Sequence, residues 1–279
     1  MKFYTNVLLY GDSILYRGYD GDKPVQYRER IRPQLYLVSH DQRKKSKYRT
    51  LDGRYAHPQY FDGAREARDF IERYNGVEGL EVHGYERFVY QWISESFPTE
   101  VQFDMSKMNI FTIDIEVACE NGFPDVQASA EEMLCITMKN VITKETITWG
   151  TREFDTADTE YRVFWSEQEM LLDFLNWWTQ NTPDVITGWN CNLYDIPYIC
   201  RRMERVLSEK HVRSLSPWNK VDMREIKIRG RDNLAYDIAG VTILDYLDLY
   251  QKFTYTNQES YRLDHIAYVE LGQNKLDHS

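Results

Sequence analysis

The order of apolar and polar positions divides the chain into two stretches of different character. Up to about residue 103, short alternating runs are separated by Gly, Asp and Pro: FYTNVLLYG, SILYRGY, PQLYLVS and the region from GLEVHG to FVYQWI. A period of two is typical of half-buried strands. One helix is predicted at 64–74, with Asp62 as its N-cap and Gly76 just after its end. We therefore expect a β-rich α+β domain over residues 1–103.

From residue 104 onward, strand-like and helix-like segments alternate. The predicted strands are NIFTIDIEVA, MLCITMKN, ETITWG and PDVITG. A capping-box pattern beginning at Ser166 opens one helix, and a second is predicted from Ile196 through CRRMERVLSEK. A hairpin with its turn around 230–233 precedes VTILDYLDLYQKF, which has the pattern of a strand passing into a helix. This order predicts an α/β domain with a mixed sheet over residues 104–279.

Composition narrows the class of protein. With 279 residues, 42% hydrophobic and 28% charged, the chain is an ordinary globular sequence long enough for two domains. No apolar run approaches membrane-spanning length and the N-terminus does not resemble a signal peptide, so we expect a cytoplasmic protein without membrane contact. The wide spacing of the cysteines argues against a disulfide framework or structural zinc site. The cysteines are Cys119, Cys135, Cys191 and Cys200.

Charge is distributed unevenly. The net charge is −10, which argues against indiscriminate nucleic-acid binding, but residues 1–100 alone carry +1. A basic stretch at 28–49 contains Arg28, Arg30, Arg32, Arg43, Lys44, Lys45, Lys47 and Arg49 against two acids. Such a stretch could face phosphates, although a solvated loop is the simpler interpretation of charge alone.

Two acids interrupt the apolar strand NIFTIDIEVAC. Asp114 and Glu116 share one face of it, about 7 Å apart along the strand, because successive side chains alternate. Two neighbouring carboxylates repel, and a divalent metal ion would turn that repulsion into shared coordination. The alternative is a strand with one solvated face.

A second polar constellation lies in TGWNCNLYDIPYIC. Asp195 stands directly before a helix opened by Pro197, where a plain N-cap is the simplest interpretation. Asn190, Asn192 and Asp195 around the turn also offer metal ligands and phosphate contacts at the end of a strand. Farther along, Asp245 and Asp248 flank a strand-to-helix passage; capping and solvent exposure explain them most simply, with a place next to a metal site as the alternative.

These motifs together carry a family resemblance. FTIDIEV resembles the first exonuclease motif of family B DNA polymerases, and GWN-x3-YDIPY resembles the second. GFPD at 122–125, VTILDYLDLYQKF and SYRLD resemble the replicative polymerases of T-even-type phages. The similarity extends over nearly the whole chain and is weakest in the first hundred residues.

The resemblance implies that residues 104–279 form a 3′–5′ proofreading exonuclease domain of ribonuclease-H-like fold with two Mg²⁺ or Mn²⁺ ions. Asp114 would bridge both ions, Glu116 would bind the ion that activates water, and Asp195 would reach the second ion largely through water. Phe123 would stack near the unpaired 3′ bases, and Asn190 would hold the strand.

The resemblance also implies partners. These are the single-stranded 3′ end and primer-template DNA, with the 226–238 hairpin helping to separate primer from template. The N-terminal domain would lie beside the template, which gives the basic stretch a task, and RNA is a further, weaker expectation for this domain. The remainder of the polymerase would act in cis or as a separate chain, in the host bacterial cytoplasm.

One element of the family pattern is not found. Such polymerases complete the site with a fourth carboxylate in a Y-x3-D motif, and the sequence ends at Ser279 before its expected position; the match from Tyr16 to Asp20 is in the wrong place. We expect the isolated chain to be a weak or inactive exonuclease without nucleotidyl transfer, since the palm, fingers and thumb are missing. The alternatives are a catalytically silent nucleic-acid-binding or scaffold subunit of a split polymerase and, more remotely, a ribonuclease of related fold.

Overall fold

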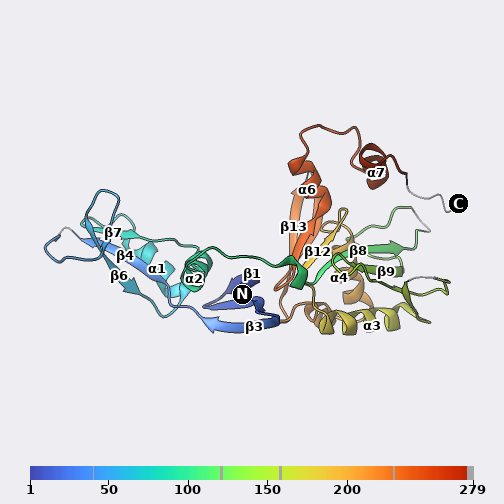
Figure 1. Ribbon diagram of the computed structural model, residues 1–279, viewed down its shortest axis with the longest axis horizontal. Coiled ribbons are helices and arrows are strands. Elements are labelled where there is room, and N and C mark those ends of the chain that lie inside the picture. The colour runs from blue at the N-terminus through green and yellow to red at the C-terminus, as the bar shows by residue number, and fades with distance from the viewer. Residues whose placement is uncertain (40, 120–121, 157–158, 229, 275–279) are drawn as a thin grey trace. The chain divides into compact units, whose positions relative to one another are not determined.

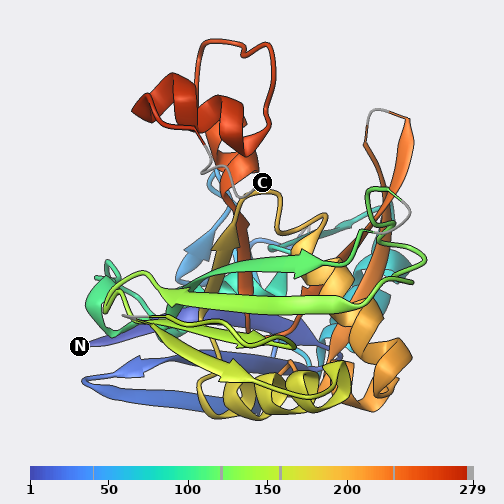
Figure 2. The same cartoon turned by 90° about the vertical axis from the view of Figure 1, so that its right-hand side faces the viewer.

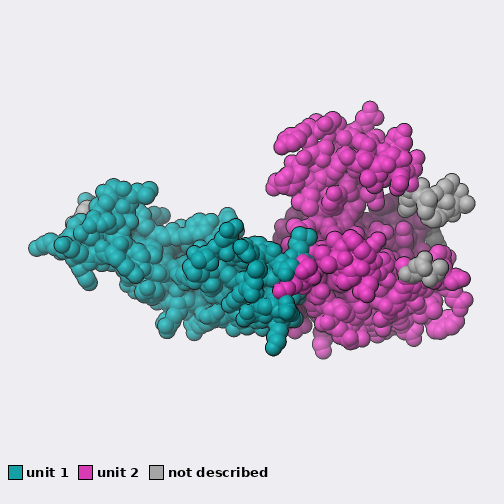
Figure 3. Space-filling model, in the orientation of Figure 1, with its two compact units in different colours: residues 1–105 teal, residues 106–279 magenta. Residues whose placement is uncertain are grey.

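Two compact units make up the protein. The computed structural model describes residues 1–39, 41–119, 122–156, 159–228 and 230–274. The units are Met1–Met105 and Ser106–Ser279, so the division lies two residues from the boundary expected between 103 and 104 (Figures 1 and 3). Each unit has an apolar core of its own.

The first unit is rich in strands (Figure 1). Its elements are β1 (Lys2–Tyr10), β2 (Ser13–Asp20), β3 (Lys23–Arg30), β4 (Gln34–Ser39), β5 (Tyr48–Arg49), β6 (Tyr55–Tyr60), α1 (Ala64–Tyr74), β7 (Leu80–His83) and α2 (Phe88–Ser96). The strands form an antiparallel sheet β1-β2-β3 and a second sheet in the order β5-β6-β4-β7. Ile14 and Tyr16 of β2 are fully buried and pack in one core with Phe88 of α2.

The segment FVYQWI, expected to be a strand, is instead the helix α2. Its apolar residues occur as the pairs Phe88/Trp92 and Val89/Ile93, four positions apart, which places both pairs on one helical face. Phe88 is buried, Val89 and Trp92 are partly buried against the same core, and Ile93 is also partly buried. The prediction was wrong because a short apolar cluster fits both periods.

Helix α1 has the predicted bounds, but its N-cap is Gly63 rather than Asp62. The amide of Arg65 donates to the Oδ1 of Asp12, 3.2 Å away. A Cβ at position 63 would lie 2.5 Å from that carboxyl group, so only glycine allows this approach. The helix start is therefore satisfied by an acid 53 residues away in the sequence.

The second unit has the expected mixed α/β architecture. A short 3-10 helix at Met105–Lys107 precedes β8 (Ile110–Val117), β9 (Met133–Asn140), β10 (Thr146–Gly150), β11 (Glu160–Val163), α3 (Glu167–Gln180), β12 (Val185–Gly188), α4 (Asp195–Val206), α5 (Glu209–Arg213), β13 (Val221–Ile228), β14 (Arg231–Ile238), β15 (Thr242–Asp245), α6 (Tyr246–Phe253) and α7 (Leu263–Leu271). The main sheet has the order β11-β10-β9-β8-β12-β15, and β13 and β14 form a separate hairpin. β9 is antiparallel to β8 and β10, whereas β8, β12 and β15 are parallel, so the prediction of a mixed sheet is confirmed.

Helices α3 and α4 pack on the sheet (Figure 2). Many of the large apolar residues of this unit are buried in the core that they form with its strands. Trp178 of α3 is buried and donates its indole N–H to the carbonyl of Leu215, 2.8 Å away. Trp177 packs edge-to-face on Phe111 of β8. Both tryptophans therefore serve helix packing.

Two predicted boundaries in this unit differ from the structure. The helix expected to run through Lys210 ends at Val206, because Ser208 adopts an extended conformation and its carbonyl accepts from the His211 amide to begin α5. The hairpin turn lies between Ile228 and Arg231 rather than at 230–233. The structure also adds β11, for which no prediction was made. No helix in the described ranges has the length and apolar character needed to cross a membrane.

Candidate active site

Three neighbouring parallel strands of the main sheet have their carboxyl ends next to one another. β8, β12 and β15 are neighbours, and Gly188 at the end of β12 is in register with Asp245 at the end of β15. The loop before α4 and the start of α6 therefore both follow the carboxyl ends of neighbouring strands. In open α/β sheets, ligands bind beyond the carboxyl ends of the strands.

β8 presents its two acids on one face, as expected. Ile113 and Ile115 are buried in the core, whereas Asp114 and Glu116 alternate with them and are exposed. The apolar face anchors the strand against α3 and α4, and both carboxylates therefore face solvent at the carboxyl end of the strand.

The loop after β12 approaches β8 closely. A Cβ at position 188 would lie 2.8 Å from the carbonyl oxygen of Ile113 and 2.9 Å from the Cβ of Cys191, so glycine is required there. Asn190 has a φ of +65°, a left-handed conformation that asparagine tolerates better than most residues. The loop thereby turns back toward β8.

This turn delivers Asp195 to the acids of β8. Asp195 is the first residue of α4, and its Oδ1 accepts a hydrogen bond from the Ile115 amide, 3.1 Å away. Ile115 stands between Asp114 and Glu116, so Asp195 is bonded to the strand segment that carries the other two predicted acids. The N-cap is Tyr194, and no side-chain cap is formed, so the interpretation of Asp195 as a plain N-cap is wrong.

The electrostatics at Asp195 are unfavourable to its charge. The residue is only 4% exposed, and burial together with the negative charge of Asp114 raises the pKa of its carboxyl group to about 7. A nearby divalent cation would offset both causes, and carboxylate oxygens are the ligands that Mg²⁺ and Mn²⁺ prefer. Asp114, Glu116 and Asp195 are the residues that could hold such an ion. Among the residues that the structure describes, no three His, Cys, Asp or Glu side chains already form a metal-binding group.

Aromatic side chains adjoin the carboxylates. Phe123 is 84% exposed, and its ring centroid lies 5.2 Å from that of Tyr194, the residue directly before Asp195. Tyr194 in turn lies 5.9 Å from Tyr198. Sequence reasoning singled out Phe123 and missed Tyr194, although its position next to Asp195 was the available signal.

The structure distinguishes the two acids after β15. Asp245 caps α6 by accepting from the Leu247 amide at 2.9 Å, as expected, but it is buried rather than exposed to solvent. Asp248 is exposed on α6. The tertiary contacts of Asp245 were not foreseen.

The basic stretch at 28–49 occupies two separate segments of the first unit. Arg28, Arg30 and Arg32 lie on β3 and just after it, and the other five side chains lie between β4 and the end of β5. The Nε of Arg30 donates to the carbonyl of Asp62 at 3.0 Å. Whether either segment meets phosphates stays a prediction.

The second segment borders a hollow of about 500 Å³ in the first unit. Tyr36, Tyr48, Arg49, Leu51 and His83 are among its lining residues. The Lys47 ammonium lies 4.8 Å from the centroid of the Tyr48 ring, inside cation–π distance.

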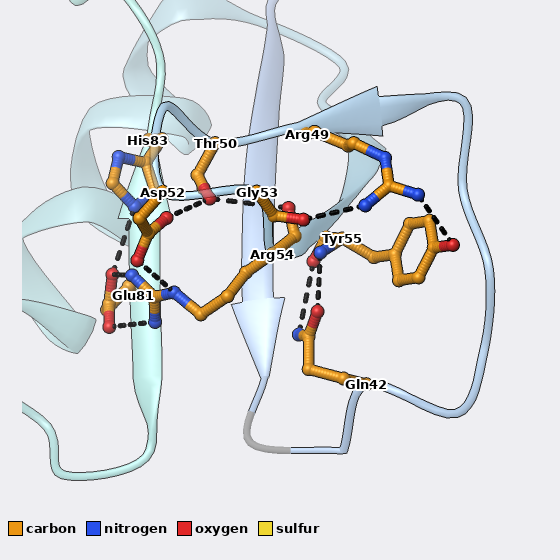
Figure 4. Close-up of polar contacts among 9 residues, drawn as sticks. All are labelled: Gln42, Arg49, Thr50, Asp52, Gly53, Arg54, Tyr55, Glu81 and His83. Atoms are coloured by element: carbon orange, nitrogen blue, oxygen red, sulfur yellow. Dashed lines mark hydrogen bonds and ion pairs between the residues drawn. The ribbon is translucent and has the colours of Figure 1, made fainter.

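Polar contacts hold the wall of this hollow. Figure 4 shows that Arg54 joins Asp52 and Glu81, with N–O distances of 2.6–2.8 Å. Arg49 donates to the carbonyl of Gly53 and to the hydroxyl of Tyr55. The loop between β5 and β6 is thereby tied down at both ends.

Comparison with known proteins gives a consistent result. Residues 89–266 match the family model of the exonuclease domain of DNA polymerase family B. The chain is similar to the DNA-directed DNA polymerases of Escherichia phage RB69 (29% identical over 303 aligned positions) and Enterobacteria phage T4 (30% over 304), each match covering 99% of this chain. A match that covers 59% of this chain is 27% identical to the DNA polymerase catalytic subunit of Human herpesvirus 7. The chain spans about a third of the length of the two phage relatives.

Proposed function

Because this chain belongs to DNA polymerase family B and contains that family's exonuclease domain, we propose that it removes nucleotides from the 3′ end of DNA by hydrolysing the terminal phosphodiester. In this proposal the chain is the N-terminal and proofreading portion of a phage replicative polymerase, and residues 104–279 have a ribonuclease-H-like fold. The central strand β8, with an antiparallel neighbour on one side and parallel neighbours on the other, supports that fold.

One observation carries the proposal: Asp195 reaches the amide of Ile115, between two exposed carboxylates, across 80 residues of sequence. Burying a carboxylate beside another acid is energetically costly unless a cation compensates the charge. Acids with perturbed pKa values of this kind cluster at functional sites. Asp114, Glu116 and Asp195 would hold two Mg²⁺ or Mn²⁺ ions. When bound, such ions activate water and stabilise the charge that develops on the leaving oxygen.

The aromatic residues support a single-stranded 3′ end as substrate. Phe123 is exposed and paired with Tyr194, which gives bases a platform for stacking next to the carboxylates. Asn190, on the loop between β12 and α4, would hold the strand. The β13–β14 hairpin, whose first strand is largely exposed, would help to separate primer from template.

The three carboxylates alone would bind ions weakly, so we propose low activity for this chain without the remainder of a polymerase. A 5′-labelled single-stranded oligodeoxynucleotide should be shortened slowly from its 3′ end in Mg²⁺ or Mn²⁺. Asp114→Ala should reduce the cleavage rate by at least about 100-fold. Removing a metal ligand has a larger effect than removing a residue that only orients a ligand, which typically costs about 10- to 100-fold. Asp248→Asn, an exposed acid on α6, is the matched control and should cleave like the wild type.

Cleavage that survives Asp114→Ala would show that the site lies elsewhere. Binding of the oligonucleotide without cleavage by the wild type would favour the silent scaffold alternative. An RNA oligonucleotide of the same sequence tests the ribonuclease alternative, which requires faster cleavage of RNA than of DNA.

A second candidate function belongs to the first unit. The hollow lined by Tyr36 and Tyr48, together with the exposed Lys44 and Lys45 a few residues before Tyr48 in the chain, supports contact with single-stranded nucleic acid, either template DNA or RNA. Tyr48→Ala should weaken binding of both by a similar factor in fluorescence anisotropy if stacking drives it, whereas Tyr10→Ala on β1 should leave binding unchanged.

A further inference from the structure

Asp245 makes more contacts than a helix cap needs. Its Oδ1 accepts from the amides of Leu247 and Asn190, each 2.9 Å away, and its Oδ2 accepts from the amide of Asn192, also at 2.9 Å. The residue is 5% exposed. Hydrogen bonds from several backbone amides stabilise a buried carboxylate, so this group is compensated without a cation.

Two of these three amides belong to the loop that places the candidate site. The carbonyl of Asn190 accepts from the amides of Leu193 and Tyr194, and the carbonyl of Cys191 accepts from the amide of Ile196. These bonds fold residues 190–196 into a compact turn. Asn190 holds its left-handed conformation within this turn, and a conformation of that kind persists only where surrounding contacts fix it.

The turn ends where the chemistry is proposed. Asp195 follows Tyr194 directly, and its carboxylate bonds to the Ile115 amide of β8. A continuous path therefore runs from Asp245 on β15, through the loop after β12, to the acids of β8. Its steps are the hydrogen bonds from the loop amides to Asp245, the hydrogen bonds within the loop, and the hydrogen bond from the Ile115 amide of β8 to Asp195.

We infer that Asp245 is a positioning residue of the proposed exonuclease site: by binding the amides of Asn190 and Asn192, it fixes the loop that carries Asn190 and Asp195 beside Asp114 and Glu116. This inference rests on the proposed function. Both oxygens of Asp245 already accept from backbone amides, so we assign it no role as a metal ligand.

Serine at position 245 separates the two tasks of the aspartate. Its hydroxyl can still cap α6 through the Leu247 amide, since serine is a favoured N-cap residue, but it has one short oxygen instead of two and cannot also hold both loop amides. Asp245→Ser therefore removes the loop contacts while keeping the helix start. Asp248→Asn is the matched control, because it removes a charge from the same helix close to Asp245 but leaves the hydrogen bonds between Asp245 and the loop in place.

The first measurement is amide hydrogen exchange on the full chain without metal. In Asp245→Ser, the amides of Asn190 and Asn192 should exchange at least about tenfold faster, while the amide of Leu247 keeps its protection. Asp248→Asn should match the wild type at all three. Unchanged exchange at Asn190 and Asn192 would overturn the inference, since the loop would then be held by other contacts.

The second measurement is 3′ shortening of the labelled oligonucleotide in Mn²⁺, with Mn²⁺ affinity from electron paramagnetic resonance. Asp245→Ser should lower both the rate and the affinity by about tenfold, the effect expected of residues that orient metal ligands. If exchange rises but cleavage and affinity equal those of the wild type, the positioning role is wrong while the proposed function stands. If the wild type itself neither binds Mn²⁺ nor cleaves, the proposed function fails, and the positioning role fails with it.

Discussion

At the scale of single residues, Asp195 makes the stability of the metal-free protein depend on pH. Its pKa is raised from 3.8 to about 7, so between about pH 4 and pH 7 the folded state keeps a proton that the unfolded state has lost. The contribution of this residue to stability therefore falls as pH rises through that window and stays low above pH 7. The shift corresponds to about 4 kcal/mol.

Asp195→Asn removes this titration and keeps an oxygen that can accept from Ile115. In EDTA, urea unfolding should find the variant more stable than the wild type at pH 8, with the difference vanishing near pH 4. Millimolar Mn²⁺ should reduce the advantage at pH 8, because a cation stabilises the charged wild-type carboxylate. A difference that is the same at all pH values would contradict the assignment of Asp195 to a repulsive site.

Another prediction concerns the buried ion pair between Glu167 and Arg202, whose side chains are 8% and 11% exposed. Two N–O contacts of 2.6 Å join them, and Arg202 also donates to the carbonyls of Ser129 and Ala130. Arg202→Met should destabilise the protein by about 3 kcal/mol, because it leaves the buried Glu167 charge without its cation.

Arg213, paired with Glu209 on the surface of α5, provides the comparison. Arg213→Met should cost less than about 1 kcal/mol, since exposed pairs contribute little. Equal losses of unfolding free energy in the two variants would show that burial does not determine how much the ion pair between Arg202 and Glu167 contributes to stability.

At the scale of elements, helix α3 starts with a local cap. Ser166 is extended, and its hydroxyl oxygen accepts from the amide of Glu169 at 3.3 Å. Ser166→Ala should lower the free energy of unfolding by about 1 kcal/mol, whereas Ser166→Thr, which can form the same cap, should cost a few tenths. Chemical denaturation followed by circular dichroism checks both, and equal stability of the alanine and threonine variants would contradict the cap.

The starts of α1 and α4 differ from that of α3, because their side-chain hydrogen bonds involve residues far away in the sequence. Local sequence around Ser166 predicted its cap correctly because donor and acceptor are three residues apart. At α1 the acceptor is Asp12, and at α4 the acid at the start of the helix bonds to Ile115 on another strand. Sequence patterns cannot show such partners, which explains why Asp62 and Asp195 were assigned the wrong capping roles.

At the scale of the whole molecule, the two units should fold independently. The first unit has a core around Tyr16 and Phe88, and the second has a larger one around Trp149 and Trp178. We expect fragments 1–105 and 106–279 to be folded on their own, because each carries a buried apolar cluster. The circular dichroism spectra of the fragments, weighted by length, should add up to that of the full chain. A disordered fragment 106–279 would contradict this and would weaken the proposal of a separate exonuclease domain.

The sequence by itself determined the class of the second unit and most of its elements, because periodicity and neighbouring residues decide strands, helices and local caps. It also identified the acids of β8 and the motif around Asp195. Only the tertiary structure decided that Asp195 bonds to Ile115, that α2 is a helix packed in the first core, and that Asp245 holds the loop after β12. These contacts join residues that are distant along the chain. They contribute to stability only where the groups are buried, and burial exists only once the chain has folded.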